Sequence, residues 1–160
     1  MPSADFLGTS EPAYNNMFLV YFTRLPTITP LYVAEANLPQ VAWTEQKSSY
    51  FISERKFASR GTLGDFSLTV KDFVTVNTAA ACYAWYKSVG DPNAGTLNAP
   101  SVYKSSAIYI LTDGRGNPLN TWTLSGCWPK SMSFGDLRSD ANDIVSIKID
   151  IAVDTVQLGS

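Results

Sequence analysis

The chain has 160 residues, of which 45% are hydrophobic and 16% are charged, and its formal net charge is −2. This length is typical of one domain with a core of its own, and the slightly acidic balance argues against a basic nucleic-acid-binding surface. Charged residues fall below the usual share of about 25%, so either Ser, Thr and Asn cover the exterior or other subunits do.

The first half of the chain predicts three strands and one long segment without a period. Residues 1–16 hold Pro, Ser and Asn in no regular order and are expected to form an arm. Apolar and aromatic residues predict strands over 18–25 and 31–38, and prolines follow both. Residues 65–73 alternate apolar and polar side chains, as a half-buried strand does. Residues 41–61 mix aromatic and charged residues without periodicity, which predicts a long loop that has a function or a partner.

The second half predicts one helix and one hairpin. Residues 77–89 are rich in alanine, begin with capping residues and end before Gly-Asp-Pro, so they predict a helix. Residues 91–100 are expected to form a loop. The apolar segments 104–111 and 121–128 flank a Gly- and Asn-rich turn at 113–118, and this arrangement predicts a β-hairpin.

The clearest strand covers residues 145–153. Its apolar face consists of Val145, Ile147, Ile149, Ile151 and Val153. Its polar face consists of Ser146, Lys148, Asp150, Ala152 and Asp154. A slip of one residue would exchange the two faces, so the register is strongly fixed. Together the elements predict an antiparallel β protein with one helix.

The N-terminus has neither a basic start nor an apolar run, so it does not resemble a signal peptide. No stretch approaches the roughly 18 apolar residues that a membrane-spanning helix needs. We therefore expect a soluble protein that is cytoplasmic at synthesis, with an arm at 1–16 and a single domain at 17–160.

Catalytic and metal chemistry find little support in the residue types. The chain has no histidine, which removes Ser-His-Asp and Cys-His nucleophiles and most zinc and non-haem iron sites. Cys82 and Cys127 are too few for a disulfide scaffold, and we expect two buried, reduced thiols. Ser-x-x-Lys occurs at 53–56 and 101–104, but neither match lies on a predicted helix and 17 serines make chance matches common.

The C-terminal aspartates could in principle form a calcium loop. They are Asp136, Asp140, Asp143, Asp150 and Asp154. A calcium loop of the EF-hand type needs oxygen ligands at alternate positions. Counting from Asp136, position three is Arg138, and counting from Asp140, position five is Ile144. Both registers fail, so no catalytic residue, metal site or cofactor is predicted.

Several segments stand in a characteristic order. They are a polar arm, FLVYF, LYVAEANLP, DFSLTVKDF, a short helix with Trp85, LSGCWPKSMSFGDL and NDIVSIKIDIAVD. This order resembles the tail tube proteins of contractile-tailed phages, the family that includes T4-like tail tubes. That family typically carries Gly-x-[Trp/Phe]-Pro, a short acidic stretch and Asn-[Asp/Glu]-Ile before an alternating last strand. The matching residues here are Gly126, Trp128, Pro129, Asn142, Asp143 and Ile144.

The resemblance runs from about Phe18 to Val153 and leaves the arm unmatched. It implies a mainly β fold of two packed antiparallel sheets, sandwich- or barrel-like, with one flanking helix and a long loop. It also implies a structural subunit of the inner tube of a contractile phage tail, in which rings of six copies stack into a hollow conduit for DNA ejection. The implied location is the tail of the virion, after assembly in the host cytoplasm.

The resemblance also implies partners. These are other copies of the chain, the tail sheath, the baseplate and the tail terminator, with the tape measure protein and DNA inside the lumen. Contact with DNA would be independent of its sequence, and no membrane is involved. The polar face of the last strand then becomes a candidate lumen lining, with Lys148, Asp150 and Asp154 as its charged residues.

The aperiodic segment 41–61 is the candidate contact surface between rings and subunits. It holds four aromatic residues and both signs of charge, a composition that suits an interface better than open solvent. The candidate contact residues are Trp43, Tyr50, Phe51, Arg55, Lys56, Phe57 and Arg60.

Two other functions remain open from the sequence. Related tubes in bacteriocins and in type VI-like injection systems move effectors or ions in place of DNA. A β-sandwich binding module would instead use Trp43, Trp122 or Trp128 as a platform for its ligand. An enzyme is not expected.

Overall fold

The computed structural model describes residues 16–23, 33–38, 40–75 and 77–159, which contain eleven strands and two helices. In chain order these elements are β1 (Phe18–Phe22), β2 (Val33–Ala36), β3 (Val41–Tyr50), β4 (Ser53–Leu63), β5 (Phe66–Lys71), α2 (Thr78–Val89), β6 (Gly90–Asp91), β7 (Thr96–Leu97), α3 (Pro100–Tyr103), β8 (Ser105–Thr112), β9 (Pro118–Ser133), β10 (Ser146–Ala152) and β11 (Thr155–Gly159). Apart from Asn16, the predicted arm lies outside the described residues.

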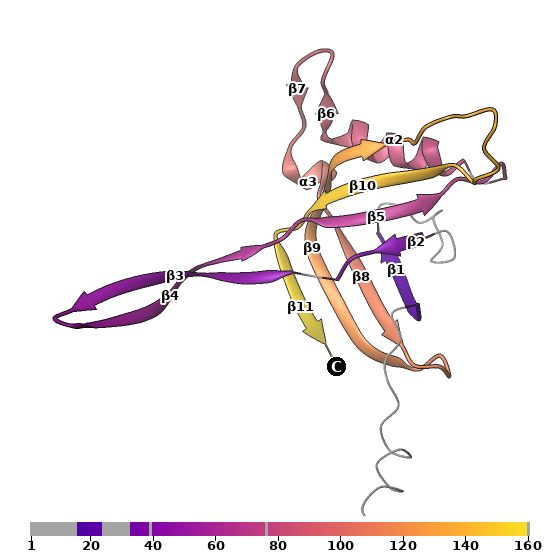
Figure 1. Ribbon diagram of the computed structural model, residues 1–160. Helices are drawn as coiled ribbons and strands as arrows, with labels where there is room; N and C mark the ends of the chain where they lie inside the picture. The colour runs from indigo at the N-terminus through magenta and orange to yellow at the C-terminus, as the bar shows by residue number, and fades with distance from the viewer. Residues whose placement is uncertain (1–15, 24–32, 39, 76, 160) are drawn as a thin grey trace, which may run out of the picture.

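Two antiparallel sheets pack on one another, and the long strand β9 belongs to both (Figure 1). The first sheet contains β1, β8, the N-terminal part of β9, and β11. The second sheet contains the C-terminal part of β9 followed by β10, β5 and β2. The predicted fold class is therefore confirmed: a mainly β protein in which two packed antiparallel sheets carry a flanking helix.

Side chains alternate along the strands, so one side of each sheet enters a shared core. The buried apolar residues are Val20, Phe22, Phe66, Leu68, Val70, Cys82, Trp85, Ala107, Tyr109, Leu124, Cys127, Ile147, Ile149 and Ile151. The three isoleucines of β10 are buried as predicted, and each contributes roughly 1.5–3 kcal/mol through burial. The strand is slightly shorter than predicted, because it begins at Ser146 and ends at Ala152.

Strand β9 passes from the first sheet to the second at Gly126. Ser125 pairs with Ser106 and Cys127 with Ser105, so Gly126 is an unpaired bulge residue. Its φ of +72° favours glycine, and a Cβ atom on it would overlap the carboxylate of Asp154. Asp154 lies where β10 gives way to β11, and its N–H donates to the Ser125 carbonyl at 3.0 Å. Strand β9 and the connection from β10 to β11 therefore pass between the two sheets at one corner.

Helix α2 confirms the predicted helix and packs against the core. Its N-terminus is capped by Asn77, whose side-chain oxygen accepts a hydrogen bond from the Ala80 N–H at 3.1 Å. Cys82 and Trp85 lie on its buried face. The indole N–H of Trp85 donates to the Tyr103 carbonyl at 3.4 Å, which ties α2 to the following helix α3.

The segment predicted as a long loop at 41–61 is instead an antiparallel hairpin, β3–β4, that projects away from the sandwich (Figure 1). Every residue of both strands is exposed. A strand acquires a period of two only when one face is buried, and neither face of this hairpin packs on the core. The prediction of a loop was wrong for that reason.

Four further elements were missed. Three of them, the two-residue strands β6 and β7 and the four-residue helix α3, lie within or overlap the predicted loop at 91–100 and are too short for a sequence pattern. The chain also continues past the expected last strand into β11, which pairs with β9 at the edge of the first sheet.

Both cysteines are free and buried in the core. Burial raises the pKa of Cys82 to about 11 and that of Cys127 to about 12, so both thiols are protonated at neutral pH. The thiolate is the reactive form, and a rise of two pKa units lowers its population roughly 100-fold. We therefore expect iodoacetamide at pH 8 to label the native protein at least about 100-fold more slowly than the unfolded protein. Mass spectrometry of alkylated protein measures this, and rapid labelling or a disulfide in native protein would contradict it.

Candidate functional site

Two surfaces carry the residues that the sequence singled out. The first is the projecting hairpin, residues 41–63. The second is the polar sheet face, the solvent-facing side of β2, β5, β10 and the C-terminal part of β9. They are formed by different parts of the chain, and the hairpin joins the second sheet where β4 leads into β5.

The projecting hairpin is held together by its own cross-strand pairs. Val41 pairs with Leu63 at its base and Tyr50 with Ser53 at its tip. The turn consists of Phe51, with a φ of +55°, and Ile52, and these two side chains are almost wholly exposed at 93% and 106%. A two-stranded hairpin by itself is only marginally stable in water, and this one packs neither face on the core.

On one side of the hairpin, its charged side, the lysines form ion pairs with glutamates of the same hairpin. Lys47 lies 3.5 Å from Glu54 and 3.9 Å from Glu45, and Lys56 lies 3.7 Å from Glu45. Lys47 and Lys56 are directly opposite one another, so the two glutamates offset a pair of like charges. Exposed pairs of this kind each contribute about 0–1 kcal/mol.

The other side, its aromatic side, has no ion pair among the described residues, and its Tyr50 ring meets only the Phe51 ring at the tip, edge to face, with the ring centroids 5.2 Å apart. Tyr50, Phe57 and Arg55 face the same way, because their register pairs are Ser53, Gln46 and Ser48. Tyr50 and Phe57 are 67% and 56% exposed. Exposed aromatic groups gathered on one surface are typical of surfaces that contact another molecule.

The seven predicted contact residues thus separate into groups. Tyr50, Arg55 and Phe57 lie on the aromatic side and Phe51 at the tip. Trp43 and Lys56 lie on the charged side, where the Trp43 ring covers Gly61. Arg60 follows Ser59 at an irregularity where two residues of β4 stand opposite one of β3.

The polar sheet face contains two of the three predicted lumen residues, Lys148 and Asp150. Lys148 stands between Thr69 and Ser133 on the neighbouring strands. Asp150 stands between Ser67 and Ser131, and the Ser131 hydroxyl donates to its carboxylate at 2.9 Å.

The charges on the polar sheet face are balanced. Lys71 and Lys148 are its basic residues on β5 and β10, and Glu35 and Asp150 its acidic residues on β2 and β10. An ion pair of 2.6 Å between Lys130 and Asp65 lies next to these strands. The remaining positions are mostly hydroxyl side chains, namely Ser67, Thr69, Ser131, Ser133 and Ser146.

The third predicted residue, Asp154, does not belong to this face. It lies in the bend after β10, and its carboxylate pairs with Lys104 at 2.5 Å. The hydrogen bond to Asp154 raises the pKa of Lys104 above its ordinary value. The prediction that Asp154 shares a strand face with Lys148 and Asp150 is therefore wrong, because the chain leaves the strand at Val153 to turn the corner toward β11.

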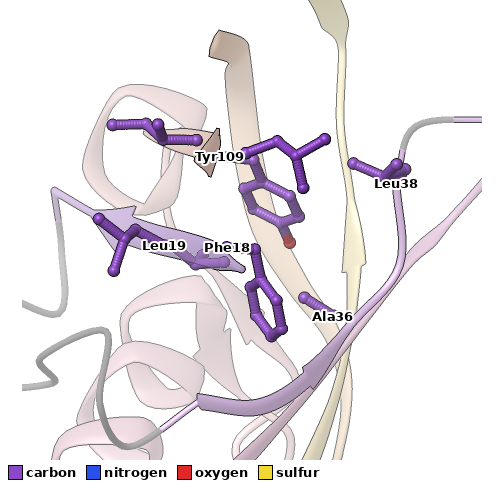
Figure 2. A pocket seen from close by; sticks show the side chains of 8 residues that line it. Phe18, Leu19, Ala36, Leu38 and Tyr109 are labelled. Carbon is purple, nitrogen blue, oxygen red and sulfur yellow. The ribbon is translucent and has the colours of Figure 1, made fainter. Parts of the chain in front are cut away.

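An apolar cavity of about 280 Å³ lies between β1, β2 and β8 (Figure 2). Its lining residues are Phe18, Leu19, Val20, Ala36, Leu38, Tyr109, Ile110 and Leu111. Among the described residues no group bonds the buried Tyr109 hydroxyl, and burial raises the pKa of that group. No acid, base or other nucleophile accompanies the tyrosine in this lining, so the lining offers apolar packing contacts and no catalytic group.

Within the described ranges, no three His, Cys, Asp or Glu side chains come together as a metal site would require. None of the helices in the described part of the chain has the length and apolar character to span a membrane.

Comparison with known proteins gives one family match. The model of the family described as T4-like virus tail tube protein gp19 matches residues 39–157. The chain matches none of the curated proteins.

Three solved structures share the fold. A chain of the PVC sheath–tube complex, an extracellular contractile injection system in its extended state, aligns with a TM-score of 0.75 and 15% identity over 100% of this chain and 99% of that one. A chain of the anti-feeding prophage (AFP) tube-terminating cap aligns with a TM-score of 0.75 and 19% identity, over 95% of this chain and 93% of that one. A chain of the AFP baseplate aligns with a TM-score of 0.71 and 16% identity, over 94% of this chain and 97% of that one. At such identities the likeness extends to the fold alone.

Proposed function

Because the chain belongs to the T4-like virus tail tube protein family, we propose that it is the repeating subunit of the inner tube of a contractile phage tail, with rings of six copies stacked into a conduit for DNA. This family consists of structural proteins, which agrees with the prediction that the chain is not an enzyme. The observation that carries the proposal is the projecting hairpin, which exposes its aromatic side and tip and has no core contacts of its own.

The hairpin is suited to join one ring to the next. It extends well beyond the sandwich, so it can reach another subunit without distorting the two sheets (Figure 1). Its aromatic side and tip supply Tyr, Phe and Arg, residue types that are enriched at interfaces. Burying these side chains in a neighbouring subunit would also stabilise the hairpin itself.

The polar sheet face is suited to line the lumen. Its serine and threonine hydroxyls are wetted, and its two lysines are matched by two carboxylates. A lysine-rich wall would hold the phosphates of DNA, whereas a balanced wall lets a polyanion slide. The outward side of the first sheet is less polar, because Tyr21 and Ile108 are 45% and 40% exposed there, and it suits protein contacts better.

A charge reversal at Asp150 tests this lumen assignment. Asp150→Lys should leave the subunit folded and assembled, with a stability change of about 1 kcal/mol or less, because the position faces solvent. DNA release per assembled tail should fall, and added salt should restore part of it. Asp150→Asn is the matched control, since it keeps an acceptor for Ser131 and removes one charge. Normal DNA release by assembled Asp150→Lys tails would argue against placing the polar sheet face in the lumen.

The proposed partners follow from the family and from the solved relatives. Tubes in those structures occur with a sheath, a terminating cap and a baseplate, and we extend these three kinds of partner to this chain. The tape measure protein and DNA would occupy the lumen without sequence-specific contacts. The assembled protein would reside in the virion tail, after assembly in the host cytoplasm.

A second candidate is the tube of an injection system that carries a cargo other than DNA. The fold shared with chains of the PVC and AFP particles favours it. Purified particles distinguish the two: nuclease-protected DNA in a capsid attached to the tube supports the phage, and tubes without a capsid support the injection system. The tryptophan-platform module is disfavoured, because Trp43 lies on the hairpin whereas Trp122 packs against the core.

A further inference from the structure

The segment between β9 and β10, residues 134–145, contains no strand or helix and is exposed throughout; we call it the acidic loop. Its exposed apolar residues are Phe134, Leu137, Ile144 and Val145. It surrounds a hollow of about 390 Å³ whose lining includes Asp136, Leu137, Asp143 and Ile144. Like the hairpin, it combines exposed apolar side chains with charge.

The acidic loop and the projecting hairpin lie at opposite ends of the second sheet. Strand β5 begins at Phe66, directly after the hairpin, and there it pairs with Ile151. It ends at Lys71, where it pairs with Ser146 at the close of the acidic loop. The six residues of β5 span roughly 20 Å, and the hairpin extends farther in the opposite direction (Figure 1). Two different surfaces at opposite ends are what a head-to-tail stack requires.

The charges of the two segments are opposite. Residues 41–63 contain four basic and two acidic side chains, a surplus of two positive charges, and residues 134–145 contain three acidic and one basic, a surplus of two negative charges. In the hairpin both lysines are paired with glutamates, so the surplus consists of Arg55 and Arg60. Neither arginine has an ion pair within the described ranges.

On the acidic loop, Asp136 and Asp143 line the hollow together with Arg138, which leaves the hollow with a surplus of one negative charge, and among the described residues none of the three forms an ion pair. Arginine binds carboxylates through two parallel hydrogen bonds, which fixes the orientation of a contact as well as adding attraction. Each subunit therefore carries two arginines without an ion pair at one end of the second sheet and two aspartates without an ion pair at the other end, with exposed apolar groups beside both pairs.

We propose that the hairpin of one subunit docks on the acidic loop of a subunit in the adjacent ring, with Arg55 and Arg60 directed at Asp136 and Asp143 and the Phe51–Ile52 tip against Leu137 and Ile144. This inference rests on the proposed tube function and identifies the surface that receives the hairpin. The contact is heterologous, so each subunit offers one hairpin and one loop and the stack grows without closing.

Charge exchange tests the proposal. The hairpin variant R55E/R60E and the loop variant D136K/D143K should each form rings but no long tubes, because each places like charges in contact. An equal mixture of the two should form tubes again, since a reversed hairpin meets a reversed loop in every second contact. The control D140K changes a charge in the same loop outside the hollow and should assemble like the wild type.

The outcomes separate this inference from the proposed function. Wild-type protein that forms no tubes would overturn the function itself. If the wild type forms tubes and either reversed variant alone also forms normal tubes, the docking surface is wrong but the proposed function stands. The same holds if the wild type forms tubes and the mixture of the two folded variants does not. Photo-crosslinking from position 51 in otherwise wild-type tubes gives an independent readout: cross-links should map to residues 134–145, and cross-links confined to other segments would contradict the proposal.

Discussion

Removal of the projecting hairpin should abolish tube formation and leave the sandwich folded. Residues 44–60 can be replaced by Asn-Gly, because Trp43 and Gly61 are register partners and would then flank a two-residue turn. No buried core residue lies in the deleted segment, so the thermal unfolding midpoint should change little. Tube length by negative-stain microscopy should fall to single rings or unstacked subunits.

The shortened subunit also offers a more specific readout. It retains the acidic loop but lacks a hairpin, so a small fraction added to wild-type protein should cap growing tubes and shorten them. The reversed-loop variant D136K/D143K is the matched comparison, because it keeps the hairpin and should block growth from the other end. Tubes of ordinary length from the shortened subunit alone would show that the hairpin does not form the ring-to-ring contact.

Gly126→Ala should destabilise the fold strongly, although it adds only one methyl group. The left-handed backbone at this position costs alanine about 1–2 kcal/mol. The added Cβ would overlap the Asp154 carboxylate and displace it from Lys104, and overpacking of this kind typically costs about 1–3 kcal/mol more. We expect a total loss of roughly 2–5 kcal/mol in the free energy of unfolding, measured by urea denaturation.

Gly116→Ala separates the two causes. Gly116 also has a positive φ, of +85°, but a Cβ atom on it would meet nothing within 4 Å. This control should lose only the backbone contribution of about 1–2 kcal/mol. Equal losses for the two variants would mean that the contact with Asp154 does not define the corner between the sheets.

Elements with a buried face could be predicted from the sequence. Strand β10 places Ile147, Ile149 and Ile151 in the core, and burial produces the alternation that revealed it. Helix α2 was recognisable because Asn77 caps a run of alanines. The hairpin has no buried face and therefore no period, so its strands were not predicted although its role as a contact surface was proposed from composition.

The features that could not be predicted from the sequence depend on contacts between distant parts of the chain. Asp154 continues the polar alternation of β10 in the sequence, and only its pairing with Lys104, 50 residues away, reveals that the chain has left the strand. The charged and aromatic sides of the hairpin depend on which residues of β3 and β4 stand opposite one another, and an irregularity beside Trp43 shifts that register. The position of the aspartates at 136–143 likewise depends on the fold, because only the pairing of β5 with β10 places the acidic loop at the far end of the second sheet from the hairpin.

Cryo-electron microscopy of assemblies grown from the purified chain is the most direct test of the account. We expect hollow tubes of stacked six-subunit rings, with the polar sheet face of β5 and β10 toward the lumen and each hairpin extending into the adjacent ring. Protein that remains monomeric at high concentration, or tubes that turn Lys148 and Asp150 outward, would contradict it.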